Sequence, residues 1–318
     1  MIARAERSLA RFRVLFDCWF SERTLHAGSP SPVQHGFDVL DAQGRTFVQD
    51  GALWLRTTEF GDDKDRVLER SSGEHTYFAS DIAYHQEKLE RGFDLLIDVW
   101  GADHHGYVPR MHAAFQALGG RPEQLELVIM QFVHLVEGGE RGKMSKRAGE
   151  FVTLDDLVAD IGVDAARWFL LARSHDTTID LDLDLAREQS NENPVFYVQY
   201  AHARIASVLR KAGDERVARA LAGAGIVAEE LHPSERALLR RVLDLPDEVA
   251  EAADRRAPHR IATYALDLAQ GFSAFYRDCQ VVGVEADVED FRLRLSVATR
   301  DALARSLDLL GVGAPVEM

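Results

Sequence analysis

The 318-residue sequence lacks the features that mark secreted and membrane proteins. Its two cysteines, Cys18 and Cys279, lie far apart, so they provide neither a disulfide framework nor a C-x-x-C zinc pair. No apolar run is long enough to cross a membrane, and the first residues lack the apolar core of a signal peptide. These absences favour a protein of the reducing cytosol.

Basic residues are outnumbered by acidic ones, 37 to 52. The formal net charge is −15, whereas a protein that binds nucleic acids indiscriminately needs many basic residues to contact phosphates. The composition therefore argues against a non-specific nucleic-acid binder. It leaves room for one defined basic face on an acidic body.

The most informative feature that is present is the cationic tract at 142–149, GKMSKRAG. It follows an apolar, β-branched stretch at 125–136, which predicts a buried strand that ends in a loop. Flexible ammonium groups suit a polyphosphate whose charge moves during a reaction. An isolated K-x-x-K would instead indicate an ordinary solvated turn.

The first part of the chain mixes predicted strands and helices. Apolar stretches at 94–100 and 125–136 flank a predicted helix at 108–118, which gives a βαβ unit of a parallel sheet. Ligands bind at the carboxyl ends of such strands. We therefore expect the turn at 101–106 and the cationic tract to face one site. Strands are also predicted at 53–58 and 77–79, and a helix capped by Ser80 or Asp81 runs to about 91.

From Thr153 onward the pattern is helical. The sequence predicts a helix that opens at 154–158, another element from Asp164, and a long helix that contains 196–209. Amphipathic helices are expected at 234–249, 258–282 and 290–310. The fold class is thus α/β plus all-α, with a catalytic region at 1–152 that is half of a Rossmann domain and a helical bundle at 153–318.

Three groups of polar residues could form sites, and each has an ordinary alternative. Asp81 could bind a cationic ligand or simply cap a helix. His104 and His105 could suggest a metal, but adjacent histidines seldom chelate one ion, and solvated loop histidines or polar substrate contacts are the alternatives. The stretch 189–205 carries amides, tyrosines, a histidine and an arginine, which suit unpaired RNA bases. Its aromatic residues could equally belong to a helix core.

Taken together, these strings resemble the arginyl-tRNA synthetases, a family of class I aminoacyl-tRNA synthetases. KMSKR is similar to the second class I signature, and Asp164-Ala165-Ala166-Arg167 is similar to the motif that names the family's anticodon-binding domain, with Ala166 in place of leucine. The remaining matching strings are FD at 16–17 with WFSER at 19–23, DGALW at 50–54, RTTEFGDDKDR at 56–66, TYFASDIAYH at 76–85, DVWGADHHGY at 98–107 and the stretch 189–204.

The resemblance implies specific roles. The substrate arginine would be bound by Tyr77, Asp81 and His104, since a carboxylate matches the donor fork of a guanidinium. The adenosine part of ATP would lie near Gly101, Asp103 and His105, and its phosphates near Lys143, Ser145 and Lys146. The residues expected to contact the tRNA anticodon are Tyr197, Tyr200, His202, Arg204 and Met318.

The implied activity is that of a cytosolic arginine–tRNA ligase with tRNA(Arg), L-arginine and ATP as partners. Mg²⁺ would accompany ATP, and no protein-bound metal is expected. The family's H-x-G-H turn and the domain that precedes it do not occur in the 318 residues, and 30–49 fit the family poorly. We therefore expect a carboxyl-terminal portion, either monomeric or paired with an amino-terminal part, whether as a truncated chain, a misplaced start or a split-gene product. A non-catalytic tRNA-binding remnant is the alternative; the cysteine enzyme is disfavoured because its zinc-binding cysteines are missing.

Overall fold

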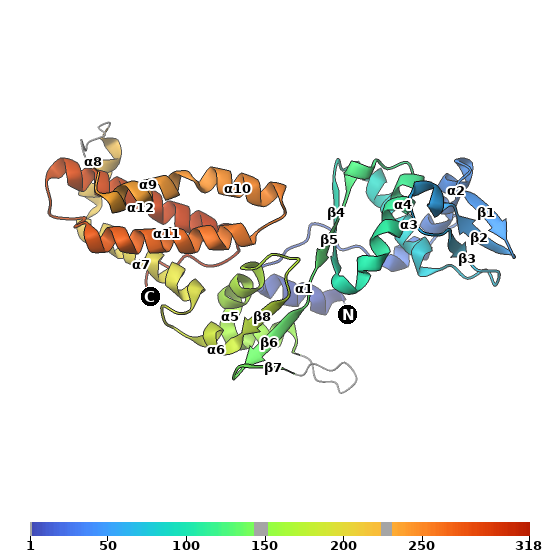
Figure 1. Ribbon diagram of the computed structural model, residues 1–318, viewed down its shortest axis with the longest axis horizontal. Coiled ribbons are helices and arrows are strands. Elements are labelled where there is room, and N and C mark those ends of the chain that lie inside the picture. The colour runs from blue at the N-terminus through green and yellow to red at the C-terminus, as the bar shows by residue number, and fades with distance from the viewer. Residues whose placement is uncertain (1, 143–151, 224–230) are drawn as a thin grey trace. The chain divides into compact units, whose positions relative to one another are not determined.

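The computed structural model describes residues 2–142, 152–223 and 231–318. The chain forms two compact units. One is Phe16–Phe132, and the other combines Met1–Leu15 with Val133–Met318. Each unit is described by itself below, with the element labels of Figure 1.

The Phe16–Phe132 unit begins with a short helix and a three-stranded antiparallel sheet in the order β1-β2-β3. Asp50 and Gly51 both have positive φ, 53° and 75°, as the tight turn between β1 and β2 requires. Helix α2 packs against α3 behind this sheet and buries Phe37 and Leu40. The elements are η1 Glu22–His26, α2 Pro32–Ala42, β1 Thr46–Gln49, β2 Ala52–Leu55, η2 Thr57–Phe60 and β3 Arg66–Glu69.

The predicted βαβ unit is confirmed. Strands β4 and β5 pair in parallel from Leu96 opposite Leu125 to Gly101 opposite Met130. Helix α4 connects them and buries Met111 and Phe115 completely. The elements here are α3 Tyr77–Glu90, β4 Leu96–Gly101, η3 Ala102–Tyr107, α4 Val108–Ala117, η4 Pro122–Gln124 and β5 Leu125–Met130.

Several local predictions were wrong. The single helix expected at 234–249 is divided at Asp244, and a strand at Ile179–Asp182 lies in the part that was expected to be helical. The expected strand at 77–79 is the first turn of α3, whose N-cap position is Thr76, so Ser80 and Asp81 lie inside the helix and do not cap it. The single strand expected at 125–136 is divided, since β5 ends at Met130 and a separate strand starts at Val133. That second strand belongs to a different sheet from β5.

The other unit contains a small sheet in the order β7-β6-β8, in which β6 and β8 are parallel. Helix α5 begins with a capping box between Thr153 and Asp156 and bends at Gly162, which has φ 78°. The elements are α1 Ile2–Arg11, β6 Val133–Glu137, β7 Glu140–Arg141, α5 Leu154–Leu171, β8 Ile179–Asp182 and α6 Leu183–Arg187.

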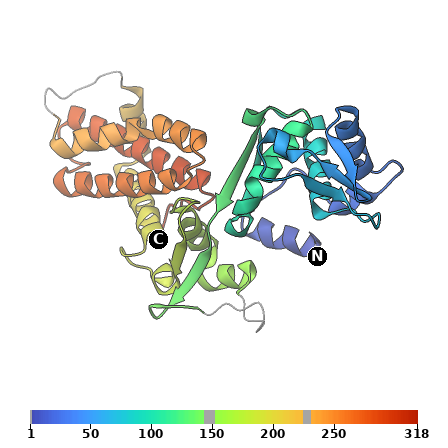
Figure 2. The same cartoon turned by 45° about the vertical axis from the view of Figure 1, so that its right-hand side comes forward.

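The rest of this unit is the helical bundle that the sequence predicted (Figures 1 and 2). Tyr264, Phe272 and Phe275 are among its largest fully buried side chains. None of the helices described is both long and apolar enough to span a bilayer. The bundle consists of α7 Pro194–Ala212, α8 Asp214–Ala222, α9 Pro233–Leu243, α10 Leu245–Asp254, α11 His259–Asp278 and α12 Ala286–Leu309.

Candidate functional site

The predicted phosphate-binding residues Lys143, Ser145 and Lys146 lie outside the described residues. The described chain reaches Gly142, whose amide donates to the carbonyl of Leu135 on β6 at 2.8 Å. Their role therefore stays a prediction.

Asp81 lies inside α3 and is half-buried. The hydroxyl of Tyr107 donates a hydrogen bond to its Oδ2 at 2.8 Å. Burial raises the pKa of the Asp81 carboxyl, and the Tyr107 bond only partly offsets that effect. Burial and the Asp81 charge together raise the pKa of Tyr107, so the phenol stays a donor. Among the described residues, no lysine or arginine forms an ion pair with Asp81, and the site can therefore accept a cation.

The backbone at Asp81 is held by a buried polar network. His85 Nδ1 lies 2.7 Å from the Asp81 carbonyl oxygen, and His85 Nε2 lies 2.8 Å from Asp98 Oδ2 on β4. Lys88 donates to the other oxygen of Asp98. Burial opposes the charge of Asp98, but the hydrogen bonds and charges of His85 and Lys88 outweigh it and lower its pKa to about 2. The network ties α3 to β4.

Tyr77 and His104 have open rings and belong to the same unit as this carboxylate. Tyr77, the first residue of α3, is 79% exposed, and the His104 side chain is 60% exposed. The His104 ring centre lies 6.1 Å from that of Trp100, which in turn lies 5.9 Å from that of Tyr107. The structure thus links His104 to Asp81 through two aromatic rings within one unit.

Gly101, Asp103 and His105 lie where β4 ends and η3 begins, as the sequence predicted for a ligand site. All three are exposed. A Cβ atom at Gly101 would lie 2.7 Å from Asp103 Oδ1, so glycine allows this carboxylate to fold close to the backbone. In the described part of the chain, His, Cys, Asp and Glu form no group of three or more that could hold a metal ion.

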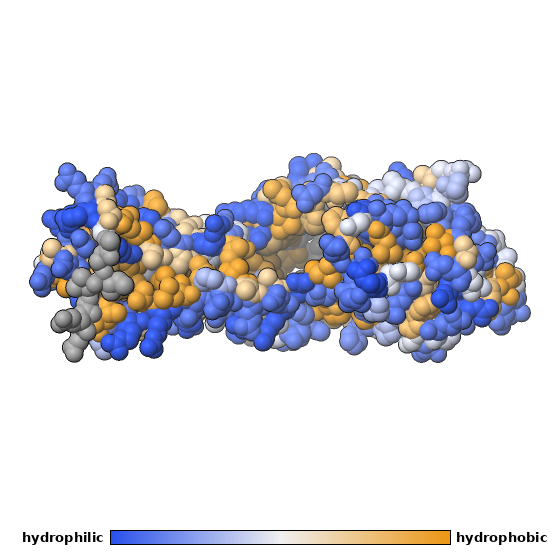
Figure 3. Space-filling view, turned by 90° about the horizontal axis from the view of Figure 1, so that it is seen from above, coloured by the Kyte–Doolittle hydropathy of each residue, from blue (hydrophilic) through white to orange (hydrophobic). Residues whose placement is uncertain are grey.

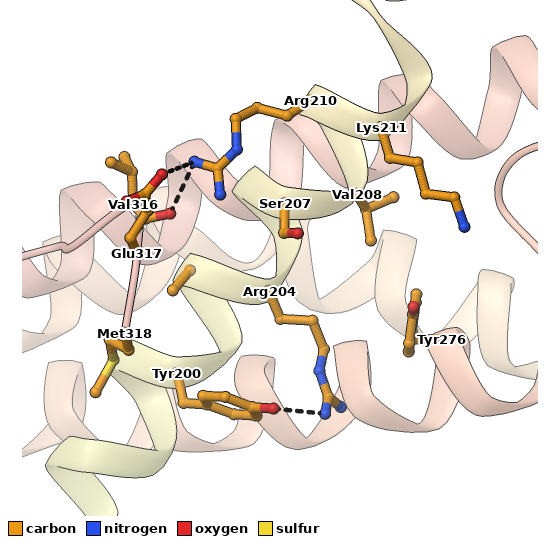
Figure 4. Close-up of a pocket in the computed structure, with 11 residues that line it drawn as sticks. Tyr200, Arg204, Ser207, Val208, Arg210, Lys211, Tyr276, Val316, Glu317 and Met318 are labelled. Atoms are coloured by element: carbon orange, nitrogen blue, oxygen red, sulfur yellow. Dashed lines mark hydrogen bonds and ion pairs between the residues drawn. The ribbon is translucent and has the colours of Figure 1, made fainter.

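A second group of predicted residues lies on α7, far along the sequence. The Arg204 guanidinium donates to the Tyr200 hydroxyl at 3.0 Å and lies 4.8 Å from the centre of the Tyr200 ring (Figure 4). It also lies 5.5 Å from the ring of Tyr276 on α11. Phe196 stacks on Tyr200 from the preceding turn. The Tyr200 and Tyr276 rings and the Arg204 guanidinium line one open surface.

Tyr197 and His202 face the interior instead. The Tyr197 hydroxyl donates to Ser273 Oγ at 2.9 Å, and Tyr197 packs against the core of the bundle. His202 is 4% exposed, and its Nδ1 donates to the carbonyl of Pro315 at 2.8 Å. Both side chains therefore support the surface from behind.

Met318 lines a groove of about 530 Å³ together with Tyr200, Arg204 and Tyr276. The last residues of the chain form one wall, where Arg210 donates to the Val316 carbonyl and pairs with Glu317, both at 3.2 Å (Figure 4). A second hollow of about 420 Å³ shares Tyr276, Val208 and Lys211 with this groove. The two hollows form one continuous surface.

Several residues of both sites were missed in the sequence. Lys211 lines the groove at its edge, and the described structure shows no hydrogen bond or ion pair for it (Figure 4). Tyr276 comes from α11, and no local pattern links it to α7. The one signal in the sequence that could have identified Tyr107 is its position close to the strand-end histidines, at the end of the WGADHHGY string.

Two families match the chain. The class I (R) tRNA synthetase catalytic domain matches residues 30–206, and the DALR anticodon-binding domain matches residues 198–318. The first match covers more than half of the sequence and includes Asp81, His104 and the tract at 142–149. The second includes the groove.

Similar proteins agree with these matches. The chain is 48% identical over 317 residues to an arginine–tRNA ligase of Heliobacterium modesticaldum, with 98% of this chain and 56% of the relative covered. It is 50% identical over 311 residues to one from Listeria monocytogenes, with 98% and 55% covered. A Campylobacter jejuni crystal structure assigned as an arginyl-tRNA synthetase superposes with a TM-score of 0.91 at 33% identity, covering all of this chain and 68% of that one. The chain spans little more than half the length of the curated relatives, and it belongs to the arginyl-tRNA synthetase family of class I aminoacyl-tRNA synthetases.

Proposed function

We propose that this chain supplies the arginine pocket, part of the ATP site and the anticodon-binding bundle of a cytosolic arginine–tRNA ligase. In the first step, an arginine carboxylate oxygen attacks the α-phosphorus of ATP, forming arginyl-adenylate and releasing pyrophosphate. In the second, the terminal adenosine hydroxyl of tRNA(Arg) attacks the activated carbonyl, forming the ester and releasing AMP. Positioning and charge stabilisation suffice for both steps.

The observation that carries this proposal is the half-buried Asp81 carboxylate, which Tyr107 orients at 2.8 Å and which no described cation pairs. A guanidinium would supply the missing positive charge and two matched donors. Tyr77 and His104, whose rings are open, would bind the rest of the substrate arginine. Because burial raises the pKa of Asp81, a bound cation would also favour the ionised carboxylate.

ATP would bind at the carboxyl end of β4. Gly101 allows the Asp103 carboxylate to lie close to the backbone. Asp103 and His105 then offer polar contacts to the adenosine part. We assign Lys143, Ser145 and Lys146 to the phosphates. Mg²⁺ would arrive on ATP, since it retains much of its water and binds phosphate oxygens.

The anticodon would bind in the groove of the bundle. Tyr200 offers a stacking face, Arg204 a planar cation and Met318 an apolar contact at the groove wall. Tyr197 and His202 would act indirectly, by holding α7 against α11 and the last segment of the chain. We propose a boundary between the catalytic and anticodon-binding regions at residues 152 and 153. We also propose that the chain acts either as a monomer or in a pair with an amino-terminal part.

ATP–pyrophosphate exchange with arginine and tRNA(Arg) tests the proposal. The 318-residue chain alone is expected to give no useful exchange, because it spans only 56% of its relatives. Adding a polypeptide that carries the unmatched part of a relative should restore it. Exchange that stays absent after such addition, with both polypeptides folded and associated, would contradict the assigned activity.

A further inference from the structure

The segment Leu310–Met318 follows α12 without regular secondary structure, yet side chains of α7 hold it along its length. Gln199 donates to the Gly313 carbonyl at 2.9 Å, His202 to the Pro315 carbonyl at 2.8 Å and Arg210 to the Val316 carbonyl at 3.2 Å. Its last residues are the wall of the groove described above.

Two residues of α5 fix the other end of this segment. The Asp164 carboxylate accepts hydrogen bonds from the Gly313 amide at 3.1 Å and from the Gln199 side-chain amide at 2.8 Å. It also forms an ion pair with Arg13. Arg167 donates through Nε to the Leu310 carbonyl and through a terminal nitrogen to the Phe12 carbonyl, both at 2.7 Å. One carboxylate and one guanidinium thus organise the turn out of α12.

The glycines of the turn match these contacts. Gly311 has φ 66°, and a Cβ atom there would lie 2.4 Å from Arg167 Nε. A Cβ atom at Gly313 would lie 3.1 Å from Asp164 Oδ2. The backbone therefore approaches the Asp164–Arg167 pair as closely as glycine permits.

We propose that Asp164 and Arg167 are positioning residues for RNA recognition: they set the path of Leu310–Met318 and so place Glu317 and Met318 at the groove wall. The inference rests on the proposed anticodon-binding role of the groove. Both side chains form hydrogen bonds with backbone atoms of the turn, and a role in core packing alone would not explain these contacts.

The test uses the 318-residue chain with Arg167→Lys or Asp164→Asn. Lysine keeps the charge, but its single compact ammonium cannot span the two carbonyls that Arg167 reaches from separate nitrogens. Amide hydrogen exchange at residues 311–318 should accelerate by roughly tenfold or more, the equivalent of one lost charge-assisted hydrogen bond. Exchange in α11 should stay unchanged. Asp160→Asn is the matched control, since this aspartate lies on the same helix but pairs with Arg187.

Binding to arginine tRNA separates this inference from the proposed function. Arg167→Lys should weaken tRNA binding by roughly tenfold. Removing residues 315–318 from this variant should cause no further loss of tRNA affinity. Unchanged exchange at 311–318 overturns the inference. If Tyr200→Ala weakens binding but Arg167→Lys does not, positioning is again refuted while the groove assignment stands. If neither variant affects binding although exchange accelerates, the groove assignment itself is wrong.

Discussion

In the proposed function, Asp81 owes its recognition role to its surroundings. Burial penalises its charge, and a neutral phenol orients it without neutralising it. Its helix is fixed by the His85–Asp98 contact, which reaches the Asp81 carbonyl itself. A carboxylate that is oriented but not yet paired gains more from a guanidinium than a solvated one does.

Asp81→Asn should mainly impair arginine recognition in the complemented enzyme. Removing one partner of a partly desolvated charge pair costs about 2–5 kcal/mol. The arginine concentration needed for half-maximal pyrophosphate exchange should therefore rise much more than that of ATP. Tyr107→Phe is the control, because it removes the orienting donor and keeps the charge, and its effect should be smaller. Equal losses for both substrates would show that Asp81 only supports the helix.

The low pKa of Asp98 predicts an acid-sensitive contribution to the free energy of unfolding. Its pKa is about 2 in the folded protein against an ordinary value near 4, so the folded state favours the ionised form. This contribution, about 2 kcal/mol, is present above pH 4 to 5 and is lost as pH falls toward 2. Asp98→Asn should flatten that part of the pH profile of the free energy of unfolding.

Urea unfolding followed by tryptophan fluorescence measures this effect. In a Trp168→Phe background, the remaining tryptophans, Trp19, Trp54 and Trp100, all lie in the Phe16–Phe132 unit. Asp94→Asn is the control, since Asp94 is exposed just before β4. An unchanged acid slope in Asp98→Asn would remove the linkage.

At the scale of elements, α7 presents two faces with different roles. Val198, Ile205 and Leu209 are buried in the bundle, whereas Tyr200, Arg204 and Lys211 line the groove. The same helical period therefore builds both a core face and a groove face. Residues on the groove face should affect RNA binding in two distinguishable ways.

Tyr200→Ala and Lys211→Ala should have different signatures in tRNA binding. Loss of a stacking ring costs about 1–3 kcal/mol and should weaken arginine tRNA more than an anticodon-swapped variant. Loss of the Lys211 ammonium should weaken both RNAs alike and reduce the salt slope by about one. Affinities measured at several salt concentrations separate the two, with Arg236→Ala on α9 as an exposed cationic control. Equal effects of Tyr200→Ala on both RNAs would contradict the anticodon assignment.

The sequence predicted elements better than it predicted their partners. The period of α7 and the βαβ order were sufficient, because both are local patterns. The strand expected at 77–79 failed because Tyr77 and Phe78 favour strands locally, while α3 packs Phe78 and Ile82 into a core that short-range patterns do not reveal. The tertiary partners Tyr107 and Tyr276 required the fold. So did the burial of His202, which the aromatic string had suggested as a surface residue.

At the scale of the whole molecule, the uncovered strand β4 is the outstanding feature. Among the described strands it pairs with β5 alone. Ile97 and Val99 project from one face and are 42% and 64% exposed, whereas Leu96 and Asp98 on the other face are buried. The face of the molecule seen in Figure 3 carries hydrophobic areas among hydrophilic ones. Exposed alternate apolar residues on a strand are the pattern expected where a further layer of polypeptide packs on a sheet.

We expect the polypeptide that restores pyrophosphate exchange to cover this face of β4, because the relatives are nearly twice as long as the matched region. Val99→Lys should then weaken association of the two polypeptides, since a fully buried valine contributes about 1.5–3 kcal/mol and a buried unpaired ammonium costs more. Val48→Lys is the matched control: Val48 is 71% exposed on β1. Titration of the added polypeptide, followed by exchange rate and by light scattering, gives the affinity. Equal affinities for the Val99→Lys and parent chains would show that the second polypeptide binds elsewhere, and the exposed face of β4 would then need another explanation.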